Sequence, residues 1–420
     1  MKSATSESEK LVIIGNGLAA MQLLKELDFQ SQYQVCVLSA ESVPHYNRIM
    51  LSSLLADEVN LTSITPCNDQ WYQERNIQVH LNHKVQTINY QQQTLSCENG
   101  AEFHYDKLVF ATGSQTYIPN IPGTFIDEIP DGVIGFRELF DVEYMRKIAA
   151  QHQNAVVVGA GLLGIEAAVG LINQGMKVTL LHRRDTVMNR QIDHTASELL
   201  KKELLQRGIQ IITGNEPVKI HKNTINQQIA QVCAVELDNG DKYPADLVVF
   251  ATGIVPCVQL AQDSGLLVKK GIVVDQHMQT NQANVYALGE CCEFNGTTYG
   301  LVAPIWNQAK VLAANLKGEN ARYQEAEFAT KLKVSGVDVH SMGYINPEQI
   351  ISGCEVIELQ DFDAAVYKKI LISNHKVVGA VLYGDVADSQ WYFELLQDQQ
   401  DISALRDGLI FGRAFCSPLC

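Results

Sequence analysis

Two glycine-rich turns contain the residue pattern in this 420-residue chain that most clearly suits chemistry. One reads Gly-x-Gly-x-x-Ala from Gly15, and the other reads Gly-x-Gly-x-x-Gly from Gly159. The first glycine permits a sharp turn, the second lets backbone approach a pyrophosphate, and the small third residue lets a helix pack against a strand. The helix N-terminus then directs N–H groups at the phosphates. Each turn therefore predicts a dinucleotide site.

Each turn lies inside the pattern of a βαβ unit, which must position it. An apolar run precedes the turn, a helical segment follows it (18–28 and 162–174), and a second apolar run closes the unit (Gln34–Leu38 and Lys177–Leu181). With this context a nucleotide site is favoured over a bare turn. The predicted contacts are Gly15, Gly17, Leu18, Ala19 and Ala20 in the first unit, and Gly159, Gly161, Leu162, Leu163 and Gly164 in the second.

The residues after each closing strand indicate which nucleotide is bound. An acid about 20 residues beyond the turn commonly binds the adenosine ribose, and the nearest acid in the first unit is Glu41. The second closing strand ends in His182, Arg183 and Arg184 instead of an acid. Because the guanidinium of arginine can donate two parallel hydrogen bonds to the oxygens of a 2′-phosphate, the second unit is expected to accept NADPH as well as NADH. A solvated basic turn without a ligand is the alternative interpretation.

A second repeat and an acidic turn extend the pattern. Two apolar strands end in Ala-Thr-Gly, the first at Gly113 and the second at Gly253. A later strand ends in Gly289-Glu290, and such an acid can accept a hydrogen bond from a flavin ribityl hydroxyl. Alone it would more often be a surface turn, but beside two dinucleotide turns it indicates a flavin site.

The remaining elements predict an α/β fold with two Rossmann-like dinucleotide-binding domains and a small C-terminal α+β domain. The other expected elements are β-meanders at 84–104 and 217–243, a helix at 303–316, strands at Lys331–Val339, Val366–Ser373 and Lys376–Leu382, a tight turn at Asn374-His375, and a helix at 388–410. The expected domains are 1–120 with 247–325 for FAD, 121–246 for NAD(P)H, and 326–420.

Composition excludes several classes of partner. The 32 basic and 47 acidic residues give a net charge of −15 without a basic run, which makes nucleic acid or an anionic membrane a poor partner. Residues 1–10 lack the apolar core of a secretory signal. The longest apolar stretch, 155–172, contains the second glycine turn. We therefore expect a cytoplasmic protein with no membrane segment.

The ten cysteines include no CxxC pair, so no zinc or iron–sulfur site is predicted and no metal is expected. Two close pairs leave a question open. Cys416 and Cys420 form a C-x3-C tail, and Cys291 and Cys292 are adjacent. Each pair could be a redox pair or part of a cluster, but ordinary thiols are favoured.

The order of the motifs resembles the FAD-dependent pyridine nucleotide oxidoreductases. Segments 44–53, 300–304 and 331–339 resemble the flavin module of bacterial NAD(P)H nitrite reductase large subunits and of assimilatory nitrate reductase electron-transfer subunits. Rubredoxin and ferredoxin reductases are near cousins. The resemblance covers essentially the whole chain.

This resemblance implies roles for individual residues. Arg48 would neutralise pyrophosphate charge, Pro304 and Trp306 would lie beside the isoalloxazine ring, and Glu166 would face the nicotinamide. The alternatives are an ordinary surface arginine, a buried helix-packing aromatic at Trp306, and a helix-start acid favoured by the dipole at Glu166. The full set of implied FAD contacts is Gly15, Gly17, Arg48, Val85, Ala111, Thr112, Gly113, Gly289 and Glu290.

Departures from the resemblance narrow the expected function. Residues 40–60 and 135–145 contain no cysteine, which argues against disulfide or peroxide reduction. Ser53 stands where rubredoxin-reductase relatives often carry lysine, and neither the iron–sulfur nor the sirohaem domain of nitrite reductase is expected here. Hydride would pass from nicotinamide C4 to flavin N5, and electrons would then go to an iron–sulfur or similar redox protein, in nitrite or nitrate assimilation.

Three alternatives to this function stay open. One is an NAD(P)H-dependent rubredoxin or ferredoxin reductase. Another is a flavin-binding sensor without turnover, and the third is a thiol enzyme using the paired cysteines.

Overall fold

The computed structural model describes residues 8–27, 33–125, 129–225, 229–325, 330–334, 336–350 and 353–416. The chain divides into two compact units. Unit 1 comprises 1–54, 59–116 and 254–326, and unit 2 comprises 55–58, 117–253 and 327–420.

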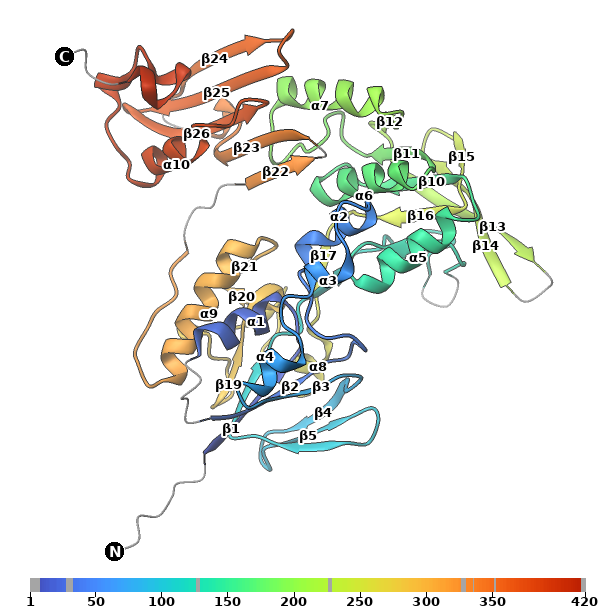
Figure 1. Ribbon diagram of the computed structural model, residues 1–420, viewed down its shortest axis with the longest axis vertical. Coiled ribbons are helices and arrows are strands. Elements are labelled where there is room, and N and C mark those ends of the chain that lie inside the picture. Colours follow the sequence, from blue (N-terminus) through green and yellow to red (C-terminus); the bar gives the residue numbers. More distant parts are fainter. Residues whose placement is uncertain are drawn as a thin grey trace, which may run out of the picture. The chain divides into compact units, whose positions relative to one another are not determined.

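Unit 1 is built around a five-stranded parallel sheet with the order β19-β7-β1-β2-β3 (Figure 1). Its strands are β1 (Glu9–Ile14), β2 (Tyr33–Leu38), β3 (Ile77–His80), β7 (Lys107–Phe110) and β19 (Val285–Ala287). Leu11, Ile13 and Val109 are fully buried, because the sheet is covered on both faces. Helices α1 (Leu18–Glu26) and α9 (Val302–Leu316) pack against each other.

Shorter elements complete unit 1. The small sheets are β4 (Val85–Asn89), β5 (Thr94–Cys97) and β6 (Glu102–His104); β8 (Ser114–Thr116) with β17 (Ile254–Pro256); and β18 (Ile272–Val273), β20 (Cys292–Phe294) and β21 (Thr297–Thr298). The short helices are α3 (Leu61–Ile64), α4 (Asp69–Gln73), α8 (Gln259–Asp263), and the 3-10 turns Arg48–Met50 and Gly289–Cys291, with α2 (Leu51–Leu55) at the boundary of the unit.

Unit 2 repeats this plan in its first part. A five-stranded parallel sheet has the order β12-β11-β10-β16-β9. Its strands are β9 (Val133–Gly135), β10 (Asn154–Val158), β11 (Lys177–His182), β12 (Gln210–Thr213) and β16 (Leu247–Phe250). The helices are α5 (Leu139–Ala149), α6 (Leu162–Asn173) and α7 (His194–Gln206), and the meander is β13 (Pro217–Ile225), β14 (Ile229–Leu237) and β15 (Lys242–Pro244). In each sheet the first strand of the βαβ unit is central, so its glycine turn lies where the strand order reverses.

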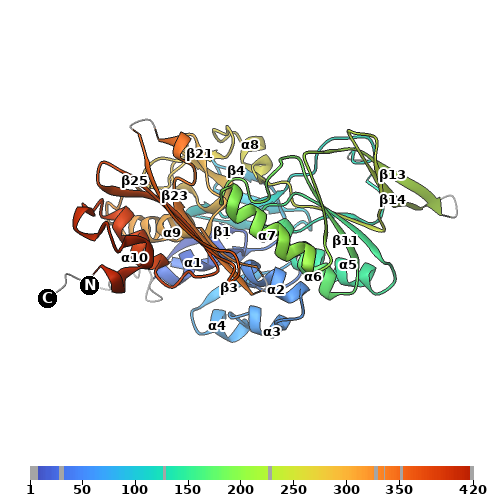
Figure 2. The ribbon, with the colours of Figure 1, turned by 90° about the horizontal axis from the view of Figure 1, so that it is seen from above.

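The last part of unit 2 is an antiparallel sheet with the order β22-β23-β26-β25-β24. Its strands are β22 (Thr330–Val334), β23 (Val337–Gly343), β24 (Glu355–Asp361), β25 (Val366–Ser373) and β26 (Lys376–Tyr383). Helix α10 (Ser389–Gln397) packs on β26, and Figure 2 shows the helix beside the sheet that includes β23 and β25. Ile370, Leu382 and Tyr392 form part of the apolar core between them. The 3-10 turns are Pro347–Gln349, Ser403–Leu405, Leu409–Phe411 and Arg413–Phe415.

Most of the predicted elements are confirmed. The helices at 18–28, 162–174 and 303–316 correspond to α1, α6 and α9, and both meanders form. Asn374 and His375 both have positive φ, of 49° and 59°, as a tight turn between paired strands requires. Among the described residues, no helix is long and apolar enough to cross a membrane.

Two predictions for the C-terminal part are wrong. Lys331–Val339, expected as one strand, is split into the hairpin β22–β23 around Gly336, whose φ of +97° suits a reversal. The helix expected at 388–410 ends at Gln397, because Gln399 adopts a φ of +51° and only short 3-10 turns follow.

Candidate functional site

The first glycine turn packs tightly against the neighbouring strand end. Gly15 has a φ of +107°, and a Cβ placed on it would lie 2.3 Å from the carbonyl oxygen of Ala111. No larger residue fits there without moving backbone. The turn and the Ala-Thr-Gly strand end, predicted separately, are therefore parts of one structure.

The N-terminus of α1 offers a cradle for an anion. Gly17 is its N-cap residue, and no described side chain caps it, which leaves first-turn N–H groups available. A Cβ on Gly17 would lie 3.9 Å from Nε of Arg48, so the guanidinium lies beside the turn. Among the described residues nothing accepts a hydrogen bond from the buried Nδ2 of Asn16. These features fit the pyrophosphate of FAD.

Glu41 and Arg48, which were assigned to different parts of FAD, lie together. The Arg48 guanidinium forms an ion pair with one carboxylate oxygen of Glu41, and the hydroxyl of Tyr46 donates to the other at 2.8 Å. Arg48 also lies over the Tyr46 ring, 5.0 Å from its centroid. Arg48 is thus no isolated surface arginine, and the pair is placed to act as one unit.

His45 holds the backbone of the first turn, a role that sequence reasoning missed. Its Nδ1 lies 3.1 Å from the carbonyl oxygen of Asn16 and, since a carbonyl only accepts, carries the proton. The pKa of His45 is lowered to about 4, mainly by burial; Lys25 and Arg48 also lower it, while the hydrogen bond to Asn16 and the charge of Glu41 act in the opposite direction. The imidazole is therefore neutral at pH 7.

Acid should loosen this turn. The folded pKa of His45 lies below its usual 6.5, so its contribution to stability is complete above pH 6.5 and is lost as the pH falls toward 4. We expect flavin retention and the unfolding midpoint to decline across this window, by an effect on the order of 3 kcal/mol at most. His45→Asn, which keeps a donor near Nδ1, should flatten the decline. An equal decline in both proteins would contradict this assignment.

The acidic turn at Gly289-Glu290 is buried against the first unit's other motifs. A Cβ on Gly289 would lie 2.8 Å from Cβ of Ala19, and Gly289 N donates to Oε1 of Gln308 at 2.8 Å. The hydroxyl of Ser114, next to the first Ala-Thr-Gly, donates to Glu290 at 2.7 Å. The surface-turn interpretation is wrong, since Gly289 is buried. A polar Gln308 on the buried face of α9 was the available signal for its role.

The other residues predicted to contact FAD occupy strand ends and α9. Val85 begins β4 and is 7% exposed, and the hydroxyl of Thr112 donates to the carbonyl oxygen of Cys257 at 2.8 Å. Pro304 is buried in the first turn of α9. Trp306 is 49% exposed, so the interpretation as a buried helix-packing aromatic is wrong.

The second glycine turn has the same steric design as the first. Gly159 has a φ of +110°, and its Cβ would lie 2.4 Å from the carbonyl oxygen of Ala251. A Cβ on Gly164 would lie 1.7 Å from the carbonyl oxygen of Gly159, so the helix rests directly on the turn. Gly161 faces open space at the uncapped start of α6 among the described residues. This cradle fits the pyrophosphate of a nicotinamide nucleotide.

His182 buttresses this turn. Its Nδ1 accepts a hydrogen bond from the backbone N–H of Ala160 at 3.2 Å, and its Nε2 lies 3.2 Å from Oδ1 of Asn189. Nε2 therefore carries the proton. Burial lowers the pKa of His182, and Arg183 and Arg184 lower it further, while the contact with Asn189 opposes them. The uncharged His182 ring therefore links the glycine turn at Ala160 to the loop residue Asn189 through one hydrogen bond on each nitrogen.

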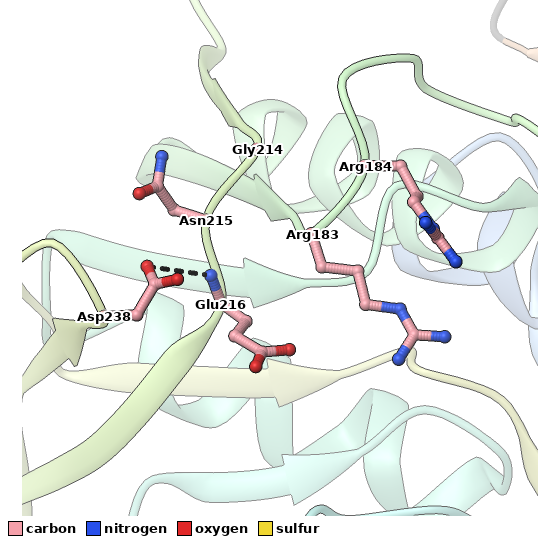
Figure 3. Close-up of a pocket in the computed structure, with 6 residues that line it drawn as sticks. All are labelled: Arg183, Arg184, Gly214, Asn215, Glu216 and Asp238. Atoms are coloured by element: carbon pink, nitrogen blue, oxygen red, sulfur yellow. Dashed lines mark hydrogen bonds between the residues drawn. The ribbon is translucent and has the colours of Figure 1, made fainter.

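A polar pocket of about 320 Å³ lies at the carboxyl ends of β11 and β12 (Figure 3). Its lining residues are Arg183, Arg184, Gly214, Asn215, Glu216 and Asp238. Figure 3 shows both arginine side chains extending away from Asn215 and Asp238. Asp238 instead accepts a hydrogen bond from the backbone N–H of Glu216 at 3.3 Å. The carboxyl edge of such a sheet is where a nucleotide's adenosine end is expected.

Glu166 and Gly253 are the remaining predicted residues of unit 2. Glu166 is the fifth residue of α6, beyond its first turn, which weakens the interpretation as a dipole-favoured acid. Gly253, with a φ of +128°, accepts a hydrogen bond from the N–H of Tyr117 at 2.9 Å.

The cysteine pairs show no redox geometry in the part of the chain that the structure describes. Cys291 and Cys292 are fully buried, burial raises the pKa of both, and their thiols donate to Leu288 and Gly289 carbonyls. Cys416 donates to a backbone carbonyl, and Cys420 lies outside the described residues. Within the described residues no three side chains gather as metal ligands.

Two parallel sheets, each with the first strand of its βαβ unit at the centre and a glycine turn at its switch point, are typical of oxidoreductases with two dinucleotide-binding domains. Comparison with known families agrees. Residues 9–314 match the pyridine nucleotide-disulphide oxidoreductase model, and residues 329–400 match the rubredoxin NAD+ reductase C-terminal domain. The chain therefore belongs to the pyridine nucleotide-disulphide oxidoreductase family.

Similar proteins include two from Bacillus subtilis. The assimilatory nitrate reductase electron transfer subunit is 37% identical over 96% of this chain and 51% of its own length. The nitrite reductase [NAD(P)H] is 38% identical over 94% of this chain and 48% of its own length. The chain thus spans about half the length of these curated relatives.

Solved structures share the fold. Putidaredoxin reductase in its covalent complex with putidaredoxin superposes with a TM-score of 0.82 at 24% identity, covering 94% of each chain. NADH:rubredoxin oxidoreductase from Clostridium acetobutylicum superposes with a TM-score of 0.74 at 23% identity, covering 94% of this chain and 96% of the other.

Proposed function

We propose that this protein passes electrons from NAD(P)H through FAD to a one-electron redox protein of nitrite or nitrate assimilation in the cytoplasm. The observation that carries the proposal is the repeated steric design, in which Gly15 abuts Ala111 and Gly159 abuts Ala251. When bound, FAD accepts two electrons from the nicotinamide and releases them singly.

In this proposal FAD occupies 1–120 with 247–325, and NAD(P)H occupies 121–246. Support comes from unit 1, which breaks off at Thr116 and resumes at Ile254. The first turn, Arg48 and Glu41 bind the FAD pyrophosphate and ribose, and Glu290, oriented by Ser114, binds the ribityl chain. The remaining FAD contacts are Leu18, Ala19, Ala20, Val85, Ala111, Thr112, Gly113, Pro304 and Trp306.

The second turn and its basic loop bind the nicotinamide nucleotide in this proposal. Gly161 leaves space for the pyrophosphate, and Arg183 and Arg184 receive a 2′-phosphate when NADPH is bound. Leu162, Leu163, Glu166 and Gly253 complete this side.

Anaerobic rapid mixing of the flavin-loaded protein with NADPH or NADH tests the proposal. Bleaching of the flavin absorbance, followed by turnover with ferricyanide and with a purified iron–sulfur component of a nitrite or nitrate reductase, is the expected result. A bound flavin that neither nucleotide reduces would refute it. Flavin reduction with negligible ferricyanide turnover would favour the sensor.

A rubredoxin or ferredoxin reductase is the second candidate. It is favoured by the match of residues 329–400 to the C-terminal domain of rubredoxin NAD+ reductase. Parallel assays with rubredoxin, a ferredoxin and a nitrite reductase iron–sulfur component as acceptors distinguish the two, since the specific partner should give a far higher kcat/KM.

The paired thiols should be dispensable. Because Cys291 and Cys292 are buried and hydrogen-bonded to backbone, replacing them with alanine, together with Cys416 and Cys420, should leave NADPH–ferricyanide turnover within about twofold of wild type. Thermal stability will fall somewhat through lost packing. A thiol enzyme would instead lose its turnover while keeping normal flavin content.

A further inference from the structure

A buried polar cluster joins the nucleotide-binding part of unit 2 to its C-terminal sheet. Asp193, Tyr367 and Lys369 are 5%, 0% and 6% exposed. Oδ2 of Asp193 accepts hydrogen bonds from the Tyr367 hydroxyl at 2.6 Å and from Nζ of Lys369 at 3.0 Å. Tyr367 and Lys369 alternate on β25, so they project from one face of the sheet toward the same carboxylate.

Both carboxylate oxygens of Asp193 have hydrogen-bond partners. Oδ1 of Asp193 accepts from the N–H of Ala196 at 3.1 Å and so caps α7, which satisfies the second carboxylate oxygen. Burial raises the pKa of Tyr367, and the carboxylates of Asp193 and Glu358 raise it further, so the hydroxyl remains a donor. Burying such an ion pair costs free energy because both charges lose their hydration, and only well-placed partners offset that cost.

Asp193 also ends the loop that carries the two arginines of the pocket. This loop, residues 183–193, holds the second glycine turn at two points. The N–H of Met188 donates to the Ala160 carbonyl at 2.8 Å, and Asn189 holds the His182 ring against the Ala160 N–H. From α7, Nζ of Lys201 donates to the Asp185 carbonyl at 2.6 Å. A continuous set of contacts therefore runs from β25 through Asp193 to the glycine turn.

We propose that Tyr367 and Lys369 are positioning residues. By holding Asp193 at the end of the loop 183–193, they set the affinity of this loop for the nicotinamide nucleotide. This inference rests on the proposed binding of NAD(P)H to the second glycine turn. With the carboxylate of Asp193 held on β25, the start of α7 and the end of the loop share one fixed point. Without that point, the loop that presents Arg183 and Arg184 loses its anchor.

Lys369→Met tests the proposal, and the chain supplies a matched control. Lys368 is the adjacent residue, is 4% exposed, and projects from the opposite face of β25, where its Nζ lies 2.6 Å from Asp385. Lys368→Met removes an equally buried lysine whose partner, Asp385, is 46% exposed and belongs to the C-terminal part of unit 2, so this variant tests the loss of a buried lysine without disturbing Asp193. The readout is the Kd of oxidised NADP+, titrated by its perturbation of the flavin spectrum in the flavin-loaded protein, with flavin content and Tm measured in parallel.

We expect Lys369→Met to raise the Kd for NADP+ about tenfold, within the range of coupling carried by packed polar networks. Lys368→Met should leave it within about twofold, although both variants lower Tm. Flavin content should stay normal in both. An unchanged Kd in Lys369→Met, or equal rises in both variants, would overturn the proposal.

Milder variants test the same proposal if Lys369→Met folds poorly. Tyr367→Phe removes one donor and no charge, and it should raise the Kd only about threefold, because Lys369 still holds the same oxygen of Asp193. Asp193→Asn keeps a good N-cap residue, and combined with Lys369→Met it leaves no unpaired charge. The double variant should then show less than the product of the single effects; strict additivity would refute the coupling. A wild-type protein that binds no nicotinamide nucleotide would instead defeat the proposed function itself.

Discussion

Gly159→Ala is expected to keep its flavin and to lose its reduction by NAD(P)H. The new Cβ would lie 2.4 Å from the Ala251 carbonyl oxygen, at a φ of +110° that alanine rarely adopts, so the second turn must shift its backbone. Because a misplacement of about 1 Å can cost roughly a hundredfold in rate, flavin reduction in rapid mixing should slow at least that much. The first turn, in unit 1, is untouched and should hold FAD.

Gly175→Ala is the matched control for this variant. Gly175 also has positive φ, +86°, and lies in unit 2 just after α6, but nothing lies within 4 Å of its Cβ position. It carries the backbone strain of roughly 1–2 kcal/mol without the collision. Its flavin reduction should match wild type, and equal slowing in both variants would attribute the effect to general destabilisation.

Replacing Arg183 and Arg184 with serine should separate NADPH from NADH. Arg183 and Arg184 are exposed, so the two together should contribute about 1.5–3 kcal/mol to binding of the 2′-phosphate, and the KM for NADPH should rise by about 10- to 100-fold. NADH lacks this phosphate, and its KM should change by less than about threefold, because the arginines line a pocket at the loop rather than the turn itself. Steady-state ferricyanide reduction with each nucleotide measures both values.

Arg190→Ser provides the charge control. Arg190 is exposed on the same loop and does not line the pocket, so its loss changes the net charge without changing the phosphate site. Its KM for NADPH should stay near that of wild type at physiological salt. The loop is a solvated basic turn if Arg190→Ser raises the KM for NADPH as much as the double variant does. The same conclusion holds if the double variant changes neither the KM for NADPH nor that for NADH.

The parts of the fold that sequence predicted are those with local, repeated signals. The turns at Gly15 and Gly159, and the helices that follow them, depend on residues close in sequence, so their pattern is complete within one βαβ unit. The C-terminal errors have a local cause too. Apolar residues alternate on each side of Gly336, at Leu332 and Val334 and again at Val337 and Val339, so each half has the pattern of a strand; the shift of the pattern by one residue between them was the available sign of the reversal.

The site contacts that sequence missed join residues far apart in the chain. Ser114 reaches Glu290 across 176 positions, and Tyr367 reaches Asp193 across 174. A lone serine or tyrosine in a strand carries no sign of such a partner. Glu216 follows a neighbouring strand, and it joins the pocket only because β11 and β12 end at the same edge.

The ribbon of β8 and β17 gives the chain a modular topology. Thr116 pairs with Ile254 where unit 1 breaks off and resumes, and directly beyond them Tyr117 and Gly253 are hydrogen-bonded to each other. Residues 117–253 therefore leave unit 1 and return to it through two paired neighbouring strands. A tight turn joining Thr116 to Ile254 would close an ordinary β-hairpin, so the inserted stretch can be exchanged during evolution without interrupting any strand of the parallel sheet in unit 1.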